Sequence, residues 1–390
     1  MKIEKDDLQI DYKKVYEIFM HHYDMCKYDP ESILLRRISN QKLKSPLFVS
    51  WEITSHCNLF CKHCRAANNY SKSHSSNHSF SEYKNVIQKI CNCEPYRLGI
   101  TGGEPFLNPF LFKIIEECKT NGLQLILYTN ATLIDDSKAK KLSELLDNYD
   151  IVHVSIDGGN EYCNDSQRGD GSFKRAIFGL ENLSHYKINV RLNIVPTLLN
   201  WTSILELCDI AIKYKVKEFG ASPLMTAGNA SEVNLAPPDS IAMFQTEINV
   251  VEKLKGTGVK YIGGISGAIH NYLYFPSLEL KQKIKRESAS KKICDAGTRK
   301  VFIDSNGDLY PCSLFASKPE FSIGNVFDES IIELWNNPQL DCFRQGFETD
   351  VICKDCELLF LCNGGCPALT YLHTKKLVGV DPRCPKKNMI

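Results

Sequence analysis

The sequence predicts an α/β fold: a parallel sheet covered by helices, followed by a smaller, loop-rich domain with many cysteines. Two observations predict it. Between residues 47 and 221, six short segments rich in β-branched and aromatic residues alternate with amphipathic helical segments, which is typical of a parallel sheet with helices outside. From residue 294 onward the pattern changes, and seven of the eight remaining cysteines recur at short spacings. Periodicity alone leaves open whether the six units lie flat or curl into a partial barrel.

The strands of the first part are expected at 47–54, 96–101, 123–128, 151–156, 189–195 and 216–221. Helices are expected to start near 108, 135, 172 and 202, with a further helix over 237–255. The first helix carries apolar residues at i, i+3, i+4 and i+7, which form one helical face: Leu111, Ile114, Ile115 and Cys118. Asn108 and Ser172 are placed to cap two of these helices, and Gly122 is placed to end one.

The composition excludes several classes of protein. The 390 residues include 47 Lys and Arg against 46 Asp and Glu, a formal net charge of +1. A protein that binds nucleic acid through phosphates usually has a basic excess, so no nucleic-acid partner is expected. No apolar run approaches the roughly 18 residues that span a bilayer, and the charged N-terminus is not a secretory signal. We therefore expect a cytoplasmic protein without a membrane partner.

Cysteine is the outlier in this composition. The chain has 17 cysteines and no export signal, and because cytosolic cysteines stay reduced, metal or redox chemistry explains them better than disulfides do. Cys57, Cys61 and Cys64 form a C-x3-C-x2-C motif just after the first expected strand. Three cysteines can hold three irons of a 4Fe-4S cluster and leave the fourth iron open. The alternative is a zinc site with His56 or His63 as the fourth ligand.

A second motif strengthens the iron–sulfur interpretation. The second expected strand ends in Thr101-Gly102-Gly103-Glu104-Pro105. The two motifs together resemble the signatures of the radical S-adenosylmethionine (SAM) enzymes, in which Gly-Gly-Glu holds the SAM amino group. Glycines admit a close ligand, and a carboxylate pairs with an ammonium. The resemblance implies a partial (β/α)6 TIM-like barrel.

The resemblance also assigns SAM-binding roles to residues near the ends of later strands. Ser155 and Asp157 would meet the ribose, and Arg168 resembles a family arginine that binds the SAM carboxylate. His63 takes the position that packs on adenine in the family. The implied SAM contacts are His63, Gly102, Gly103, Glu104, Ser155, Asp157, Arg168 and Asn193.

The cysteines of the C-terminal part follow a seven-cysteine order that resembles the SPASM extension of some radical SAM enzymes. That extension holds two auxiliary 4Fe-4S clusters. By its pattern, the outer cluster would be ligated by Cys353, Cys356, Cys362 and Cys384, and the inner one by Cys294, Cys312 and Cys366. The inner cluster is then one protein ligand short. Its fourth position is left to the substrate, to solvent or to a distant residue such as Cys342.

Four parts of the chain are therefore expected. They are an N-terminal helical extension over 1–45, the radical SAM partial barrel over 46–255, a linker over 256–293 and the SPASM domain over 294–390. The implied cofactors are SAM and three 4Fe-4S clusters.

The resemblance implies a reaction as well. One electron from the reduced cluster cleaves SAM to methionine and a 5′-deoxyadenosyl radical, which abstracts hydrogen from the substrate. The auxiliary clusters accept an electron or bind the substrate, and a reducing partner such as flavodoxin or ferredoxin supplies the first electron. No catalytic acid or base is assigned, and Tyr128, Asp308 and Tyr310 are candidates by position only.

The substrate is the most open part of this prediction. Known SPASM enzymes mostly modify peptides or proteins, so a ribosomally made peptide is the first hypothesis. Side-chain oxidation of a tetrapyrrole on a haem pathway and other small-molecule radical chemistry are alternatives. Ser313 stands where sulfatase-maturing relatives carry an aspartate base, which counts against that activity.

Two further expectations concern partners. About 45 residues precede the first strand, which is too few for the leader-recognition domain of many peptide-modifying members, so a leader-binding module would be a separate protein. Outside the enzymes, the competing hypothesis is a zinc-binding scaffold.

Overall fold

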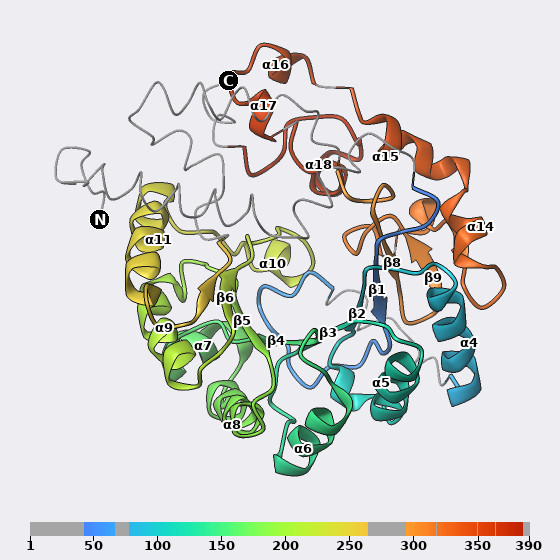
Figure 1. The fold of residues 1–390 in the computed structure, drawn as a ribbon. Helices are drawn as coiled ribbons and strands as arrows, with labels where there is room; N and C mark the ends of the chain where they lie inside the picture. Colours follow the sequence, from blue (N-terminus) through green and yellow to red (C-terminus); the bar gives the residue numbers. More distant parts are fainter. Residues whose placement is uncertain are drawn as a thin grey trace.

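The computed structural model describes residues 43–66, 78–263, 294–316, 318–348, 350–362 and 364–384. The helices expected within 1–42 and most of the expected linker, residues 264–293, lie outside the described residues. Figure 1 shows a curved sheet with an arc of helices on its outer side. The chain from residue 294 onward, in orange and red, lies at one end of this sheet.

The strands of the described chain belong to one ten-stranded sheet, in the order β10-β9-β8-β1-β2-β3-β4-β5-β6-β7. The six expected strands are confirmed as its parallel middle: β1 (Phe48–Glu52), β2 (Arg97–Thr101), β3 (Leu125–Thr129), β4 (Ile151–Ser155), β5 (Val190–Ile194) and β6 (Glu218–Ala221). Since parallel neighbours need a crossover, each connection carries a helix or helices on the outside. The sheet and its helices form the expected partial barrel.

Four short strands extend this sheet beyond the prediction. They are β7 (Lys260–Tyr261), β8 (Lys300–Ile303), β9 (Asp308–Tyr310) and β10 (Gly324–Asn325). β8 pairs with β1 in parallel, with Phe48 opposite Lys300 and Trp51 opposite Ile303. The cysteine-rich part of the chain therefore extends the sheet of the barrel, because its strand β8 pairs with β1. Three of these strands, β7, β9 and β10, have only two or three residues, which is too short for a periodic pattern in the sequence.

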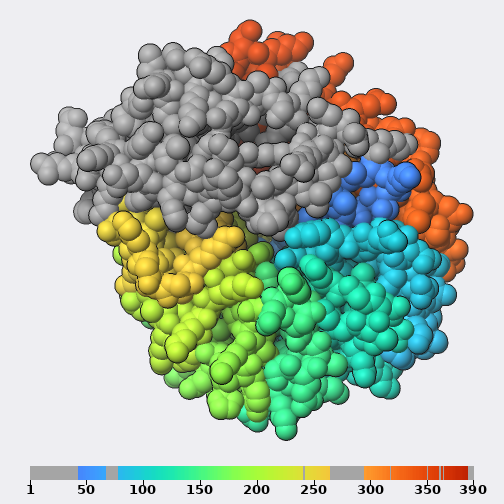
Figure 2. All heavy atoms as spheres, in the orientation of Figure 1, coloured from blue at the N-terminus to red at the C-terminus, as the bar shows by residue number. Residues whose placement is uncertain are grey.

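The outer helices are α4 (Phe80–Cys91), α5 (Leu111–Thr120), α6 (Asp136–Leu145), α7 (Glu161–Arg168), α8 (Ser172–His185), α9 (Ile204–Lys213) and α11 (Ser240–Leu254). Figure 2 shows much of this arc as a continuous outer surface in sequence order. Its inner stripes are apolar. The expected face of α5 is confirmed, because Leu111, Ile114, Ile115 and Cys118 are all buried, and their burial against the sheet stabilises the arc.

Shorter helices follow in the connections and the C-terminal part: α10 (Asn229–Glu232), α14 (Ile331–Trp335), α15 (Asp341–Gln345), α16 (Val351–Lys354), α17 (Leu359–Cys362) and α18 (Pro367–Thr374). Trp335 of α14 is fully buried, and its Nε1 donates to the carbonyl of Leu43 at 2.9 Å. In the part of the chain that the structure describes, no helix is long and apolar enough to cross a membrane.

Two cap assignments are wrong. α5 begins at Leu111 without a side-chain cap. Asn108 instead ends a 3-10 turn, and its Nδ2 donates to the Ile53 carbonyl at 2.7 Å and to the Tyr83 hydroxyl at 2.9 Å. Ser172 is the first residue of α8 rather than its cap, and its Oγ donates to Asp165 Oδ1 at 2.8 Å. The Oδ1 atom of Asn108 accepts from Phe110 N at 2.8 Å, before the helix begins. The hydroxyl of Ser172 is used by the contact with Asp165. α4 and α7 were not expected either.

Candidate active site

The first cysteine motif lies in the loop that follows β1, at the carboxyl ends of the parallel strands. Three separate segments hold the backbone of this loop. Glu104 N donates to the His56 carbonyl at 2.7 Å, and Lys62 N donates to the Gln167 carbonyl at 2.8 Å. Asn229, at the start of α10, donates from Nδ2 to the Cys61 carbonyl and from its backbone N to the Cys64 carbonyl, both at 3.0 Å. The backbone of the loop is therefore held by hydrogen bonds to three other parts of the chain.

The two glycines of the Gly-Gly-Glu motif pack against this loop. A Cβ at Gly102 would lie 2.5 Å from the Thr54 carbonyl oxygen, and one at Gly103 would lie 2.1 Å from the His56 carbonyl oxygen. Both distances are far below van der Waals contact. The glycines thus admit the backbone of the cluster loop, whereas the sequence predicted that they admit a ligand.

The thiols of Cys57, Cys61 and Cys64 lie close enough to influence one another's ionisation. Burial raises the pKa of Cys57 to about 11 and that of Cys61 to about 12, with Arg168 acting in the opposite direction. With such raised pKa values the thiols are protonated near neutral pH. The positive charge of bound iron would be needed to deprotonate them, because metal binding releases thiol protons. Within the described residues, no three His, Cys, Asp or Glu side chains converge on a position for a single metal ion.

Glu104 is fully buried beside this loop. Its Oε1 accepts from Thr129 Oγ1 at 2.8 Å and from Phe106 N at 3.3 Å, and its Oε2 accepts from Asn130 N at 2.8 Å. Burial raises the pKa of this carboxyl to about 7, against the opposing effect of its hydrogen bonds. Three of its roughly four acceptor positions are used by the protein, and one is left for an ammonium donor.

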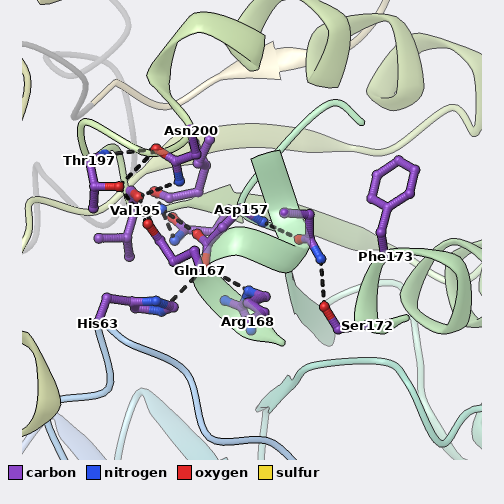
Figure 3. Close-up of polar contacts among 12 residues, drawn as sticks. His63, Asp157, Gln167, Arg168, Ser172, Phe173, Val195, Thr197 and Asn200 are labelled. Carbon is purple, nitrogen blue, oxygen red and sulfur yellow. Dashed lines mark hydrogen bonds and ion pairs between the residues drawn. The ribbon is translucent and has the colours of Figure 1, made fainter. Parts of the chain in front are cut away.

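Asp157 forms the centre of a buried charge cluster with Arg168 and His63 (Figure 3). Arg168 Nε lies 2.6 Å from Asp157 Oδ2, and His63 Nε2 lies 3.3 Å from the same oxygen. Burial lowers the pKa of His63 to about 4, although Asp157 acts in the opposite direction. Burial alone would raise the pKa of Asp157, but Arg168 and His63 outweigh it, and that pKa is lowered. The cluster is therefore a neutral imidazole beside an ion pair.

The other carboxylate oxygen of Asp157 fixes the next strand. Val195 N, just after β5, donates to Asp157 Oδ1 at 2.7 Å. Figure 3 shows that Gln167 and Thr197 continue this network, and Thr197 Oγ1 donates to Gln167 Oε1 at 2.6 Å. Of the remaining predicted SAM contacts, Ser155 and Asn193 pair directly across β4 and β5. The structure therefore brings the predicted residues of β4, β5 and α7 into one place.

The three cysteines predicted to hold the inner cluster are Cys294, Cys312 and Cys366. Burial raises the pKa of Cys294 to about 11, and both Cys312 and Cys366 act on it electrostatically. The charge of Lys300 on β8 acts to lower the pKa of both Cys294 and Cys312. Cys342 is exposed and donates from Sγ to the Gln339 carbonyl at 3.4 Å.

The four cysteines assigned to the outer cluster form a separate group. Burial raises the pKa of Cys353, and its other influences include Cys362, Cys384 and Cys356. Asp381 lies between the two groups. Its Oδ2 accepts from Cys366 N at 2.7 Å, and its own carbonyl accepts from Cys384 N at 2.9 Å.

Three polar residues of this region were missed from the sequence. Arg65 donates from Nη1 to the Ser313 carbonyl at 3.1 Å, which links the loop of Cys64 to that of Cys312. Glu52, at the end of β1, is 5% exposed, and burial raises its pKa to about 7, with Asp304 adding to the rise. Burial likewise raises the pKa of Asp304 to about 6. The sequence does contain one signal for the Glu52–Asp304 pair, because a glutamate stands in the strand directly before the cysteine motif.

Comparison with known proteins agrees with this geometry. Residues 51–211 match the radical SAM superfamily, and residues 294–357 match the SPASM iron–sulfur cluster-binding domain. The mycofactocin maturase MftC of Mycolicibacterium smegmatis is 27% identical over 348 residues, which cover 88% of this chain and 83% of that protein. The AdoMet-dependent heme synthase of Methanosarcina barkeri is 28% identical over 354 residues, 87% of this chain and 96% of that protein.

Solved structures show the same fold. SuiB of Streptococcus suis bound to S-adenosylmethionine superposes with a TM-score of 0.72 at 19% identity, over 95% of this chain and 88% of that one. The anSMEcpe structure with bound AdoMet gives a TM-score of 0.65 at 21% identity, over 86% and 93% of the two chains. The match to the radical SAM superfamily identifies the chain as an enzyme and argues against the hypothesis of a zinc-binding scaffold. The chain belongs to the radical SAM superfamily and is a radical SAM enzyme with a C-terminal SPASM domain.

Proposed function

We propose that this enzyme is an oxidoreductase that modifies a ribosomally made peptide, by crosslinking or another oxidative change. The observation that carries the proposal is the similarity of its fold, over 98% of the chain and with a TM-score of 0.71, to SuiB bound to the precursor peptide SuiA. The match to the maturase MftC over 88% of the chain supports it.

The residues present fit the implied cofactors. Cys57, Cys61 and Cys64 would hold the first cluster, and the seven cysteines of the C-terminal part would hold two more. When bound, SAM and this first cluster supply a radical that removes hydrogen from the substrate. Glu104 would receive the SAM ammonium at its remaining acceptor position. Arg168 would offer the SAM carboxylate the guanidinium nitrogens that do not face Asp157.

The charge cluster of His63, Asp157 and Arg168 would orient these contacts. Asp157 fixes Arg168 through the 2.6 Å ion pair and the β5 end through Val195. Both ionic side chains are almost fully buried, so their positions are set by the fold and change little when a ligand arrives. Their part in the reaction is to place SAM, and the chemistry belongs to the cofactors.

A second candidate is side-chain oxidation of a tetrapyrrole. The observation that favours it is the similarity to the AdoMet-dependent heme synthase, which is 28% identical to this chain over 96% of the synthase's length. Pre-heme d1 synthase of Dinoroseobacter shibae is 26% identical over 356 residues.

The test is anaerobic turnover with SAM and a chemical reductant. Synthetic peptides encoded by short reading frames beside the gene are compared with porphyrins that carry propionate side chains. A peptide product that has lost hydrogen, formed together with 5′-deoxyadenosine, is expected. Deoxyadenosine formed only with porphyrins would overturn the proposal in favour of the second candidate. The Cys57/Cys61/Cys64→Ala variant serves as the control without a radical cluster.

Partners follow from the same proposal. A flavodoxin or ferredoxin would replace the chemical reductant, and a separate leader-binding protein would deliver the peptide. Adding the purified leader-binding candidate should lower the KM for the full precursor and leave the KM for the isolated core peptide unchanged. Equal KM values with and without it would count against a separate leader-binding partner.

A further inference from the structure

One cross-strand row in the middle of the sheet is polar on four successive strands. The register places Tyr128 of β3 opposite His153 of β4, His153 opposite Arg191 of β5, and Arg191 opposite Glu218 of β6. The residues next to them in sequence are apolar, almost fully buried and part of the core shared with the outer helices: Leu127, Val154, Leu192 and Phe219. Because side chains alternate along a strand, the polar row faces the inside of the barrel.

Such a row is unusual for an α/β barrel. Closed barrels fill this space with branched aliphatic side chains, which make a packed core. A layer of phenol, imidazole, guanidinium and carboxylate instead has to be satisfied by hydrogen bonds, because unpaired polar groups are costly to bury. The chemistry of this row therefore suits contact with polar groups better than packing against apolar side chains.

His153 is the member of the row with unused capacity. Its ring lies 4.7 Å from that of Tyr128, and Gly99 of β2 leaves room for the phenol, since a Cβ there would lie 3.1 Å from Tyr128 Cε2. The Nδ1 atom of His153 is buried and has no hydrogen-bond partner among the described residues. Burial lowers the pKa of His153 to about 3, and the charges of Arg191 and Arg168 add to this. The imidazole is neutral, with one donor and one acceptor nitrogen.

Arg191 is not available to bind an anion, because it is already paired with Glu218. Its Nε donates to Glu218 Oε2 at 2.7 Å, and its Nη2 lies 2.6 Å from the same oxygen. The guanidinium is thus paired inside the barrel, and the pair carries no net charge. A substrate carboxylate would have to displace Glu218 and leave that carboxylate partly buried without its partner, which is strongly unfavourable.

The row lies directly beside the residues expected to contact SAM. His153 is two residues before Ser155 on the same strand, and Arg191 is two residues before Asn193 on the next. Ser155 and Asn193 are themselves paired, so the polar row is the adjacent inner layer of the barrel. The effect of Arg168 on the ionisation of His153 is consistent with this closeness. A substrate that faces SAM from inside the barrel would meet this layer.

We propose that Tyr128, His153 and the Arg191–Glu218 pair form a substrate subsite that takes an uncharged hydrogen-bonding group, such as a side-chain hydroxyl or amide of a peptide. The subsite rests on the proposed function and names the part of the barrel that selects the substrate. His153 Nδ1 makes the hydrogen bond, and the Arg191–Glu218 pair excludes a carboxylate from the same place.

The first test is His153→Phe, which keeps a ring on Tyr128 and removes both nitrogens. The KM for the peptide should rise about tenfold, because one buried hydrogen bond to the substrate is lost. The Kd for SAM, measured by equilibrium dialysis, should change less than about twofold. His185→Phe, at the exposed end of α8, is the matched control and should change neither value. Iron content and circular dichroism equal to the wild type exclude misfolding. An unchanged peptide KM, or a SAM Kd that rises as much as the KM, overturns the subsite.

The second test is Glu218→Gln, which keeps a hydrogen-bond acceptor beside Arg191 but removes its countercharge. Peptide analogues with a carboxylate in place of the neutral group should gain at least about fivefold in kcat/KM relative to the parent peptide, since a charge-assisted contact becomes available. No change in this ratio overturns the assignment. If the wild type acts on porphyrins alone, the proposed function fails separately. The subsite is then retained only if His153→Phe raises the KM for the porphyrin.

Discussion

Arg168 at the end of α7 and Asp157 after β4 form an ion pair of 2.6 Å in which both side chains are almost completely buried. The pair joins the loop of the first cysteine motif, through His63, to the end of β5, through Val195. Its Coulomb attraction has to offset the cost of taking two charges out of water. Removing one charge should therefore cost more than the pair itself contributes.

Asp157→Asn should lower the free energy of unfolding by about 3–5 kcal/mol, because it leaves the Arg168 charge buried without a partner. Urea unfolding under anaerobic conditions measures the change. Asp170→Asn is the matched control, since Asp170 is exposed in the turn between α7 and α8, and it should shift stability by less than about 0.5 kcal/mol. A loss below about 1 kcal/mol for Asp157→Asn would contradict the importance of the pair.

Gly103→Ala should displace the loop of the first cysteine motif, since the new Cβ would lie 2.1 Å from the His56 carbonyl oxygen. We expect the variant to reconstitute with about four fewer irons than the wild type, and iron analysis after anaerobic reconstitution measures this. Gly122→Asn is the control, because no atom lies within 4 Å of a Cβ there and asparagine tolerates its positive φ. Full iron content in Gly103→Ala would show that the loop can shift without losing its ligands.

The Cys57/Cys61/Cys64→Ala variant should fall from about twelve irons to about eight, if three 4Fe-4S clusters are present. Iron and acid-labile sulfide are measured on both proteins after reconstitution. Cys91→Ala provides a control outside the predicted ligands, because Cys91 is the last residue of the outer helix α4, and it should keep about twelve irons. Zinc in place of iron, or about four irons in wild type and triple variant alike, would contradict the cluster assignment.

Glu52→Gln should change how stability depends on pH. The fold raises the pKa of Glu52 to about 7, mainly by burial, so it favours the protonated acid. The resulting stabilisation is fully present below the unfolded pKa and is lost as pH rises through about 7. Between pH 4.5 and pH 8 the wild type should therefore lose about 3 kcal/mol relative to Glu52→Gln, which cannot ionise.

Urea unfolding at several pH values measures this difference. Glu144→Gln, an exposed position of α6, is the control and should follow the wild type across the range. A constant difference between wild type and Glu52→Gln from pH 4.5 to pH 8 would show that Glu52 does not titrate as the fold predicts.

Local sequence patterns predicted the parallel middle of the sheet, and the structure confirms it. Short β-branched strands alternate with helices of strong 3.6-residue periodicity, and these local patterns fix β1 to β6 and α5. The spacing of the ten cysteines, read by resemblance, predicts three groups of ligands. In the structure, members of each predicted group lie close enough to act on one another's ionisation. These features depend on residues that are near in sequence, which is why they could be read from it.

The contacts between these parts, in contrast, could not be predicted from local sequence. The joining of β8 to β1, the pairing of Arg168 with Asp157 and the link from Arg65 to Ser313 connect segments that are far apart in the chain or unmarked by any local pattern. The same holds for the polar row of Tyr128, His153, Arg191 and Glu218, whose members come from four strands and become neighbours only through the register. A long-range contact is chosen by the packing of the whole sheet, and local sequence carries no signal for it.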